Sequence, residues 1–295
     1  MKTATIQGTT VAAPRHGFVS DLAELVKARL TLLVLLTTAV GFYLGSESPI
    51  DYRALFHTVF GTAAAAAGAA ALNQWWERRA DALMNRTKSR PLPAGRMSPV
   101  RALALGAALS FFGVVYLAIV CNGLSAALTA ITIVIYIFAY TPLKRTSTAN
   151  TAVGAIPGAI PPMIGWAAAR GHIGVGAWSL FVIVFLWQMP HFFAIAWIFT
   201  EDYARGGFVM HSSGVNTGRQ IILYCCALIP VSLLPTLFGA TGITYLYGAL
   251  LLGFIYLGYG SAVAMFRSNT HAHRLLRISV LYLPALLVLM MFDKV

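Results

Sequence analysis

The sequence 177-AWSLFVIVFLWQMPHFFAIAWIF-199 contains no Asp, Glu, Lys or Arg. A transmembrane helix needs about 20 consecutive, mostly apolar residues, because the hydrocarbon core of a bilayer is roughly 30 Å thick. The rest of the 295-residue chain has the same character, with 58% hydrophobic residues, 10% charged residues and a mean hydropathy of +0.75. A water-soluble fold of this length could not bury so much apolar surface. The chain is therefore predicted to be an integral membrane protein.

Eight further apolar runs resemble this one, and each is interpreted as a membrane-spanning helix. The fold class predicted is an all-α integral membrane bundle of nine transmembrane helices. The predicted spans are residues 30–46, 54–76, 100–120, 123–140, 151–169, 177–199, 220–239, 243–266 and 275–292. Residues 1–29 are predicted to form a cytoplasmic N-terminal tail, and residues 30–295 a single polytopic membrane domain. No cleaved signal peptide is expected.

Two of the predicted spans have unusual compositions. The second contains the Ala and Gly run 63–71, which predicts that two helices approach closely there. The fifth contains Pro157, Pro161 and Pro162, which predict a kinked or locally unwound helix. That break is interpreted either as a packing kink or as the wall of a cavity.

The net charge of +12 comes mainly from short segments between the apolar runs. All but three of the 21 basic residues fall in the N-terminal tail or in loops on its side of the membrane, the exceptions being Arg53, Arg170 and Lys294. This asymmetry predicts a cytoplasmic N-terminus and a C-terminus outside. The basic residues are thus topology signals, and no nucleic-acid partner is expected. The absence of an Arg-rich presequence favours the cell inner (plasma) membrane over the mitochondrial inner membrane.

Acidic residues are scarce, nine in all, so their positions are informative. Asn73, Glu77 and Asp81 are spaced four apart and drift only about 80° around a helix, which places them on one face. Asp202 follows the sixth span, on the same predicted side of the membrane. The carboxylates either bind a divalent metal or pair with Arg78, Arg79 and Arg86 as a solvated cluster at the membrane interface.

Cations lie directly beyond these acids. Arg86, Lys88 and Arg90 follow the second span, and Lys144 and Arg145 follow the fourth. Mg²⁺ prefers one or two carboxylates together with phosphate oxygens, while Lys and Arg neutralise the remaining phosphate charge. The combination predicts a magnesium diphosphate site, and a location at the membrane favours an isoprenyl diphosphate. Anchoring by anionic lipids is the alternative for the pair at 144–145.

These motifs carry a family resemblance that runs from about residue 27 to the last span. The sequence 73-NQWWERRADALMNRTKSRPL-92 resembles the first aspartate-rich motif of the UbiA superfamily of intramembrane prenyltransferases. The sequences 140-YTPLKR-145 and 187-WQMPHF-192 are similar to the branch of protoheme IX farnesyltransferases, or haem O synthases. The resemblance implies transfer of a farnesyl group from farnesyl diphosphate to a vinyl group of haem B, with Mg²⁺ as cofactor. It also suggests a haem A synthase or a terminal oxidase as a downstream partner.

The resemblance implies roles for individual residues. Asn73, Glu77, Asp81 and Asp202 would be the catalytic and metal-binding set, and the five cations would bind the diphosphate. Gly206 stands where quinone-type enzymes have a second Asp, which weakens a second metal site. Lys27-Ala28-Arg29 stands where the family has Lys-Pro-Arg, a change expected to lie away from the diphosphate site.

His191 lies within an apolar run, behind Pro190, and is a candidate haem-binding residue together with Trp187. The alternative is a structural histidine that bonds a carbonyl freed by the proline. Trp75, Trp76, Tyr140 and Phe192 are further aromatic residues that could shield a carbocation. Two other functions compete with haem farnesylation. A prenyltransferase for a quinone precursor would be favoured by a second Asp-xxx-Asp site, and a transporter by the broken fifth span.

Overall fold

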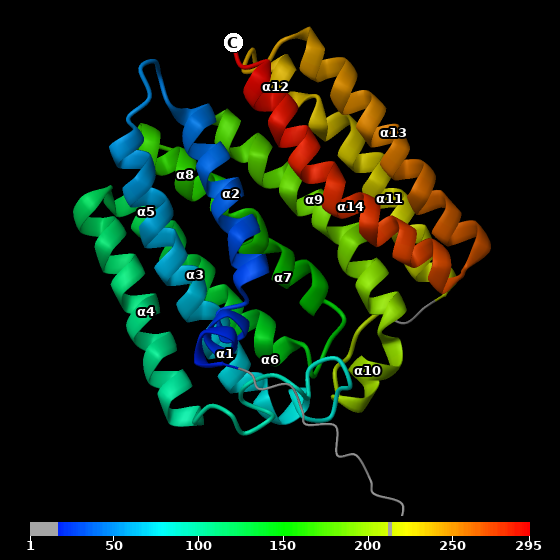
Figure 1. The fold of residues 1–295 in the computed structure, drawn as a ribbon. Coiled ribbons are helices and arrows are strands. Elements are labelled where there is room, and N and C mark those ends of the chain that lie inside the picture. The colour runs from blue at the N-terminus through cyan, green and yellow to red at the C-terminus, as the bar shows by residue number, and fades with distance from the viewer. Residues whose placement is uncertain (1–16, 212–213) are drawn as a thin grey trace, which may run out of the picture.

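The computed structural model describes residues 17–211 and 214–295. Within them, nine helices are long and apolar enough to cross a membrane, which confirms the predicted number of spans and the all-α fold. These spans are Ala28–Gly45, Tyr52–Asp81, Pro99–Val120, Gly123–Leu143, Asn150–Arg170, Val175–Ile198, Val215–Leu237, Ile243–Phe266 and Asn269–Phe292. The protein is a multi-pass membrane bundle (Figure 1).

Six spans are single helices, and three are interrupted. The continuous helices are α2 (Ala28–Gly45), α3 (Tyr52–Asp81), α4 (Pro99–Val120), α9 (Val175–Ile198), α13 (Ile243–Phe266) and α14 (Asn269–Phe292). The fourth span comprises α5 (Gly123–Val134), the π-helical segment Ile135–Tyr140 and α6 (Thr141–Leu143). The fifth comprises α7 (Asn150–Ala159) and α8 (Pro161–Arg170). The seventh comprises α11 (Val215–Ser232) and α12 (Leu234–Leu237). The described residues also form two short helices, α1 (Phe18–Leu25) and α10 (Thr200–Arg205).

The proline-rich fifth span is broken at Ile160, between α7 and α8, as the sequence predicts. Pro161 begins α8, where its missing N–H costs no helical hydrogen bond. The sixth span behaves differently, because α9 continues through Pro190 without a break. A proline alone therefore does not decide whether a span is interrupted.

The bundle has two halves, visible in Figure 1. In one half, α2 packs on α8 and α3 packs on α4. In the other, α9, α11, α13 and α14 pack around a large apolar core that includes the fully buried Tyr245, Tyr256 and Tyr282. Helix α7 contacts α9, and α2 contacts α14, so both join the halves.

The Ala and Gly run of α3 has the packing role that its composition predicts. A Cβ atom built on Gly68 would lie 2.4 Å from the backbone nitrogen of Ser110 on α4, well inside contact distance. The two helix backbones can therefore touch only because this position has no side chain. The tight α3–α4 contact holds the functional end of α3 in place.

The first described helix, α1, and the C-terminus lie at opposite ends of the bundle (Figure 1). Lys294 donates hydrogen bonds to the carbonyls of Tyr43 and Ser46, whereas α1 packs beside the other end of α3. That the α1 end faces the cytoplasm stays a prediction. Cysteines introduced at Ser48 or Gly171 should react with an impermeant thiol reagent from outside, and a cysteine at Ser98 or Ser147 should not. The reverse pattern would contradict the predicted orientation.

Candidate active site

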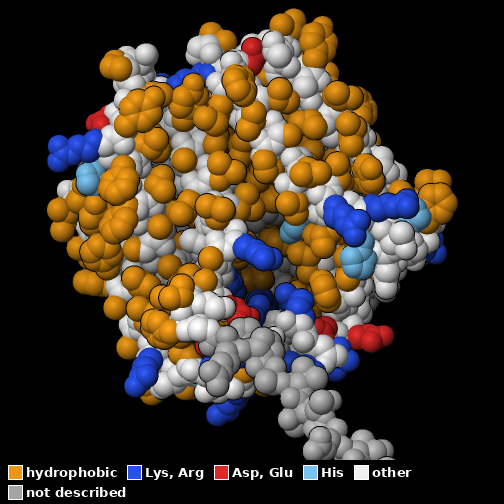
Figure 2. Space-filling model, viewed as in Figure 1, with side chains coloured by type: hydrophobic (Ala, Val, Ile, Leu, Met, Phe, Trp, Pro, Cys, Tyr) orange, Lys and Arg blue, Asp and Glu red, His pale blue; other side chains and the backbone are white. Residues whose placement is uncertain are grey.

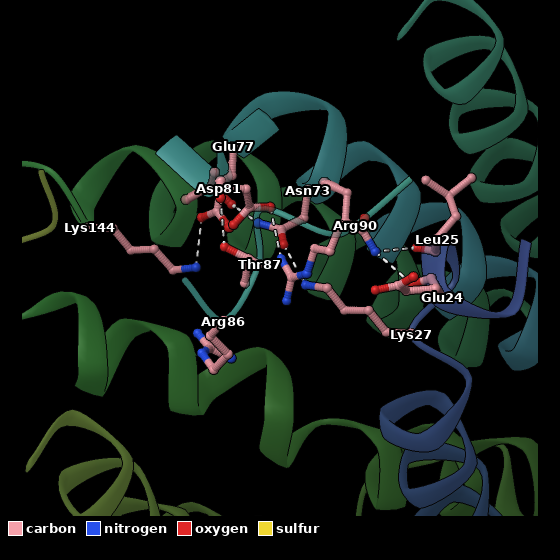
Figure 3. Close-up of polar contacts among 12 residues, drawn as sticks. Glu24, Leu25, Lys27, Asn73, Glu77, Asp81, Arg86, Thr87, Arg90 and Lys144 are labelled. Atoms are coloured by element: carbon pink, nitrogen blue, oxygen red, sulfur yellow. Dashed lines mark hydrogen bonds and ion pairs between the residues drawn. The ribbon is translucent and has the colours of Figure 1, made fainter. Parts of the chain in front are cut away.

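The last two turns of α3 carry the acidic stripe. The sequence prediction ended this span at residue 76, but the helix runs on through Asp81. Asn73, Glu77 and Asp81 are all buried, with exposed fractions of 0%, 5% and 1%. Figure 3 shows their side chains gathered on one side of the helix, as the spacing predicts.

Each residue of the stripe binds a cation from another part of the chain. Lys144 Nζ lies 2.7 Å from Glu77 Oε1, and Arg90 Nη1 lies 2.8 Å from Asp81 Oδ2. Lys27 Nζ donates to Asn73 Oδ1 at 2.6 Å. The alternative of a solvated cluster with Arg78, Arg79 and Arg86 is therefore wrong. The acids are buried, and their partners come from the segments before α2, after α3 and after α6 (Figure 3).

The pKa values of Lys144 and Lys27 are shifted in opposite directions. Burial by itself would lower the pKa of Lys144, but the charge of Glu77 outweighs it and raises that pKa above its usual range. Burial lowers the pKa of Lys27 to about 7, and the positive charges of Arg90 and Lys144 add to this effect against the opposing charge of Glu77. An arriving phosphate anion would favour the charged form of Lys27.

Lys27 is a site residue that the sequence analysis missed. Its backbone lies in the left-handed region, with φ 49°, at the turn between α1 and α2. A non-glycine residue pays about 1 kcal/mol for this conformation. The turn directs the amine toward Asn73 and Tyr136. The change in this signature is at Ala28, so the expectation that the change lies away from the diphosphate site stays a prediction. The place of Lys27 in a family signature was the signal that could have found it.

Aromatic rings border the charged cluster. Tyr136 and Tyr140 stack with their ring centroids 5.5 Å apart, and Lys144 Nζ lies 4.4 Å from the Tyr140 centroid. Both tyrosines belong to the π-helical segment Ile135–Tyr140. Trp76 differs, because it is 39% exposed on the outer side of α3, against Phe138. A role for Trp76 in shielding a carbocation is not supported by this position.

The other predicted cations are Arg86, Lys88 and Arg145. The guanidinium of Arg86 lies over the rings of Phe199 and Tyr203, below the cluster in Figure 3. Lys88 is exposed and donates to Asn85 Oδ1 at 2.9 Å, while Arg145 is exposed on the segment after α6. The structure therefore brings Arg90 and Lys144 to the acids and leaves Lys88 and Arg145 in an outer ring.

Asp202 does not join the acids of α3. Its two carboxylate oxygens accept hydrogen bonds from the backbone N–H groups of Asn85 and Arg86, at 2.9 and 3.0 Å, and it pairs with Arg205. Burial would raise the pKa of Asp202, but the bond from Arg205 and the two backbone bonds hold it below its usual range. In this arrangement Asp202 anchors the loop after α3. A metal-binding role for it would require these bonds to break.

His191 lies on α9 in the other half, behind Pro190. Its Nδ1 is 2.7 Å from Ser279 Oγ on α14, and its ring stacks on Trp187 with centroids 5.5 Å apart. Trp187 is buried and donates from Nε1 to the Ser279 carbonyl at 2.8 Å. The histidine therefore bonds a neighbouring helix, and not a carbonyl freed by the proline as the structural alternative supposed.

A hollow connects the two halves on the face shown in Figure 2. Hydrophobic side chains cover most of the face above it, one basic and one His side chain lie at its upper rim, and Lys, Arg, Asp and Glu side chains gather at its lower edge. A separate cavity of about 520 Å³ lies between α7, α9 and α11, lined in part by Phe193, His211 and Tyr224. The site thus combines a charged end with apolar space inside the bundle.

The donor set at the charged end fits a magnesium ion. In the parts of the chain described, no three His, Cys, Asp or Glu side chains gather into a metal-binding group of their own. Mg²⁺ needs no such group, because it is commonly held by one or two carboxylates plus substrate phosphate oxygens. Glu77, Asp81 and the amide oxygen of Asn73 are the hard oxygen donors that it prefers, and they are buried side by side.

Comparisons with known proteins agree with this arrangement. A model of the UbiA prenyltransferase family matches residues 34–283. The protoheme IX farnesyltransferase of Solibacter usitatus is 48% identical over 93% of this chain and 98% of its own length. That of Myxococcus xanthus is 42% identical over 94% and 95%.

Solved structures share the fold at low sequence identity. A structure described as digeranylgeranylglyceryl phosphate synthase superposes with a TM-score of 0.78, at 15% identity, over 93% of this chain and 98% of that one. A UbiA homologue from Archaeoglobus fulgidus, bound to GPP and Mg²⁺, gives a TM-score of 0.61 at 14% identity over 92% and 99%.

Proposed function

Because this chain belongs to the UbiA prenyltransferase family, we propose that it transfers the farnesyl group of farnesyl diphosphate to a vinyl group of haem B. Water adds to the same vinyl group, so the products are haem O, with a hydroxyethylfarnesyl side chain, and diphosphate. The similarity to protoheme IX farnesyltransferases over nearly the whole chain supports haem as the acceptor. The observation that carries the proposal is the buried cluster of acids and cations at the edge of an apolar hollow.

The diphosphate is proposed to bind where the cations meet the stripe of α3. Asn73, Glu77 and Asp81 would hold a Mg²⁺ ion, which when bound supplies positive charge to the leaving diphosphate. Arg90 and Lys144 then lose their carboxylate partners and are placed to neutralise phosphate oxygens. Lys27 adds a second amine on the same side. Arg86, Lys88 and Arg145 remain proposed diphosphate-binding residues, the last two from the outer ring.

The farnesyl chain is proposed to extend from the charged end into the apolar hollow. Departure of the diphosphate leaves an allylic carbocation, and an aromatic face stabilises a cation by about 0.5–2 kcal/mol. Tyr136 and Tyr140 lie beside the charged cluster and present such faces. Haem would approach from the other half, where His191 and Trp187 are the candidate binding residues.

The competing functions are less well supported. The relatives reported above are haem-modifying enzymes by name, and the second Asp-xxx-Asp site of quinone-type enzymes is replaced here by the loop anchor Asp202 and by Gly206. The broken fifth span was the argument for a transporter, but the buried acids lie at one end of α3. We further propose the cell inner membrane as the location, since the reported relatives are bacterial.

A product assay tests the proposal. Membranes containing the protein are incubated with Mg²⁺, farnesyl diphosphate and haem B, and the porphyrins are analysed by mass spectrometry. We expect farnesylated haem, and we expect it to disappear when Mg²⁺ is chelated with EDTA and return when Mg²⁺ is restored. A parallel incubation offers a hydroxybenzoate precursor of quinones. Prenylation of that compound with no change in haem would contradict the proposal and support the quinone alternative.

A further inference from the structure

Ser279 on α14 bonds two groups through one hydroxyl. The side chain is fully buried, and its Oγ donates to the carbonyl of Leu276 at 2.7 Å. The same Oγ lies 2.7 Å from His191 Nδ1. A serine hydroxyl has a single proton, so it can donate to only one partner. If that proton lies on the Leu276 carbonyl, Ser279 accepts from His191 and Nδ1 carries the hydrogen, whereas the opposite tautomer of His191 requires the Ser279 hydroxyl to turn away from Leu276.

With the Ser279 hydroxyl bonded to Leu276, the other ring nitrogen of His191 is unprotonated. No carboxylate in the described chain pairs with this imidazole, and the interior of a span disfavours an unpaired charge, so the ring is neutral. A neutral imidazole with hydrogen on Nδ1 has its lone pair on Nε2. Within the described residues, the recorded hydrogen bond of His191 is the one through Nδ1. Nε2 thus has no hydrogen-bond partner among the described residues, and the His191 side chain is partly exposed.

The ring is also held in orientation. Trp187 stacks on it with an interplanar angle of 24°, and the Trp187 indole donates to the Ser279 backbone carbonyl. Tyr256 from α13 donates to the Trp187 carbonyl at 3.2 Å. His191 is fixed by a hydrogen bond on one nitrogen and by a flat aromatic contact on its face, so Nε2 keeps one direction.

We propose that Ser279 is a positioning residue that presents Nε2 of His191 to the iron of the haem substrate as an axial ligand. Histidines that ligate metals almost always donate their other N–H to an acceptor, which fixes the tautomer and the ring orientation. Imidazole is a common axial ligand of haem iron. The inference rests on the proposed function, because it takes haem as the substrate.

The test compares two porphyrins on purified full-length protein in detergent. Haem B contains iron, and protoporphyrin IX without metal has the same ring and no iron to ligate. For Ser279→Ala we expect a roughly 10- to 100-fold loss of haem B affinity and a changed Soret band. The affinity for metal-free protoporphyrin should stay within about twofold of the wild type. His191→Ala should give the same pattern.

Ser232→Ala is the matched control. Ser232 is also fully buried, and its hydroxyl donates to the Ile229 carbonyl at 2.7 Å, but no histidine among residues 17–211 and 214–295 bonds it. This variant should bind both porphyrins as the wild type does. Ser279→Thr keeps the hydroxyl and should restore the wild-type Soret band.

Three results would overturn the inference. The first is an unchanged Soret band and an unchanged haem affinity in Ser279→Ala. The second is an equal loss of affinity for both porphyrins, which would indicate a purely structural role for Ser279. The third is an unchanged Soret band with slower turnover and a shifted pH profile, which would make His191 a proton acceptor. Failure of the proposed function appears separately, as a wild-type protein that binds haem and forms no farnesylated product.

Discussion

The two halves of the bundle hold their polar groups in different ways. Around α3, carboxylates and cations form ion pairs, such as Glu77 with Lys144, at the end of the helix. Between α9 and α14, uncharged groups form hydrogen bonds inside the spans, such as His191 with Ser279. A charged side chain costs less free energy near the aqueous end of a span than in its interior, where hydrogen bonds between uncharged groups are favoured. The difference agrees with the proposal that the diphosphate binds in the charged half and the haem in the neutral half.

Removing a carboxylate that is proposed to bind Mg²⁺ in the charged half should have the largest effect. We expect Asp81→Asn to lower turnover by at least about 100-fold, because charge stabilisation of the leaving diphosphate is lost. The measurement is the rate of haem O formation, with folding followed by circular dichroism. Glu47→Gln is the control, since Glu47 is an exposed carboxylate at the other end of the bundle. Near-normal turnover of Asp81→Asn across a Mg²⁺ titration would remove Asp81 from the site.

The inner and outer cations should differ in effect. Lys144→Met removes a buried cation that is proposed to neutralise the diphosphate, and we expect at least a tenfold fall in turnover. Lys88→Met removes an exposed amine, and we expect less than about a twofold change. The apparent KM for farnesyl diphosphate is measured for both. Equal effects would show that the outer ring contributes as much as the buried pair.

Packing in the charged half depends on small residues. Gly68→Ala places a methyl group against the backbone of α4, and we expect a loss of about 1–3 kcal/mol of stability. The control is Gly258→Ala on α13, where a Cβ atom meets nothing within 4 Å. Thermal unfolding in detergent compares the two variants. Similar melting temperatures would show that the α3–α4 contact adjusts without cost.

A small dependence of stability on pH is expected from His211, which lines the cavity between α7, α9 and α11. Burial lowers the pKa of His211, whose ring lies edge-on against Phe193. The unfolded chain therefore binds a proton at higher pH than the folded protein. Stability should fall as the pH drops below about 6.5, the ordinary histidine value, toward the lower folded pKa. In His211→Gln, melting temperatures measured between pH 7.5 and 5 should lose part of this slope, and an unchanged slope would contradict the assignment.

Composition and periodicity determined much of this protein. Long uncharged runs can satisfy their backbone in a bilayer only as helices, so nine spans follow from the sequence, and the spacing of Asn73, Glu77 and Asp81 follows from helix geometry. Proline content likewise predicted the break near Ile160. The family resemblance, also a property of the sequence, agrees with the later comparisons.

Only the tertiary structure decided which groups meet. Lys27 reaches Asn73 across 46 positions, and Lys144 reaches Glu77 across 67, because separate helices bring these segments to one end of the bundle. Sequence proximity favoured Arg78 and Arg86 as partners of the acids. Arg78 instead donates to the Trp75 carbonyl, and Arg86, beyond the end of α3, lies over the rings of Phe199 and Tyr203. The partner of His191, 88 positions away on α14, likewise follows from the packing of α9 against α14. Local spacing fixes the face on which a side chain lies, and packing between helices fixes what that face contacts.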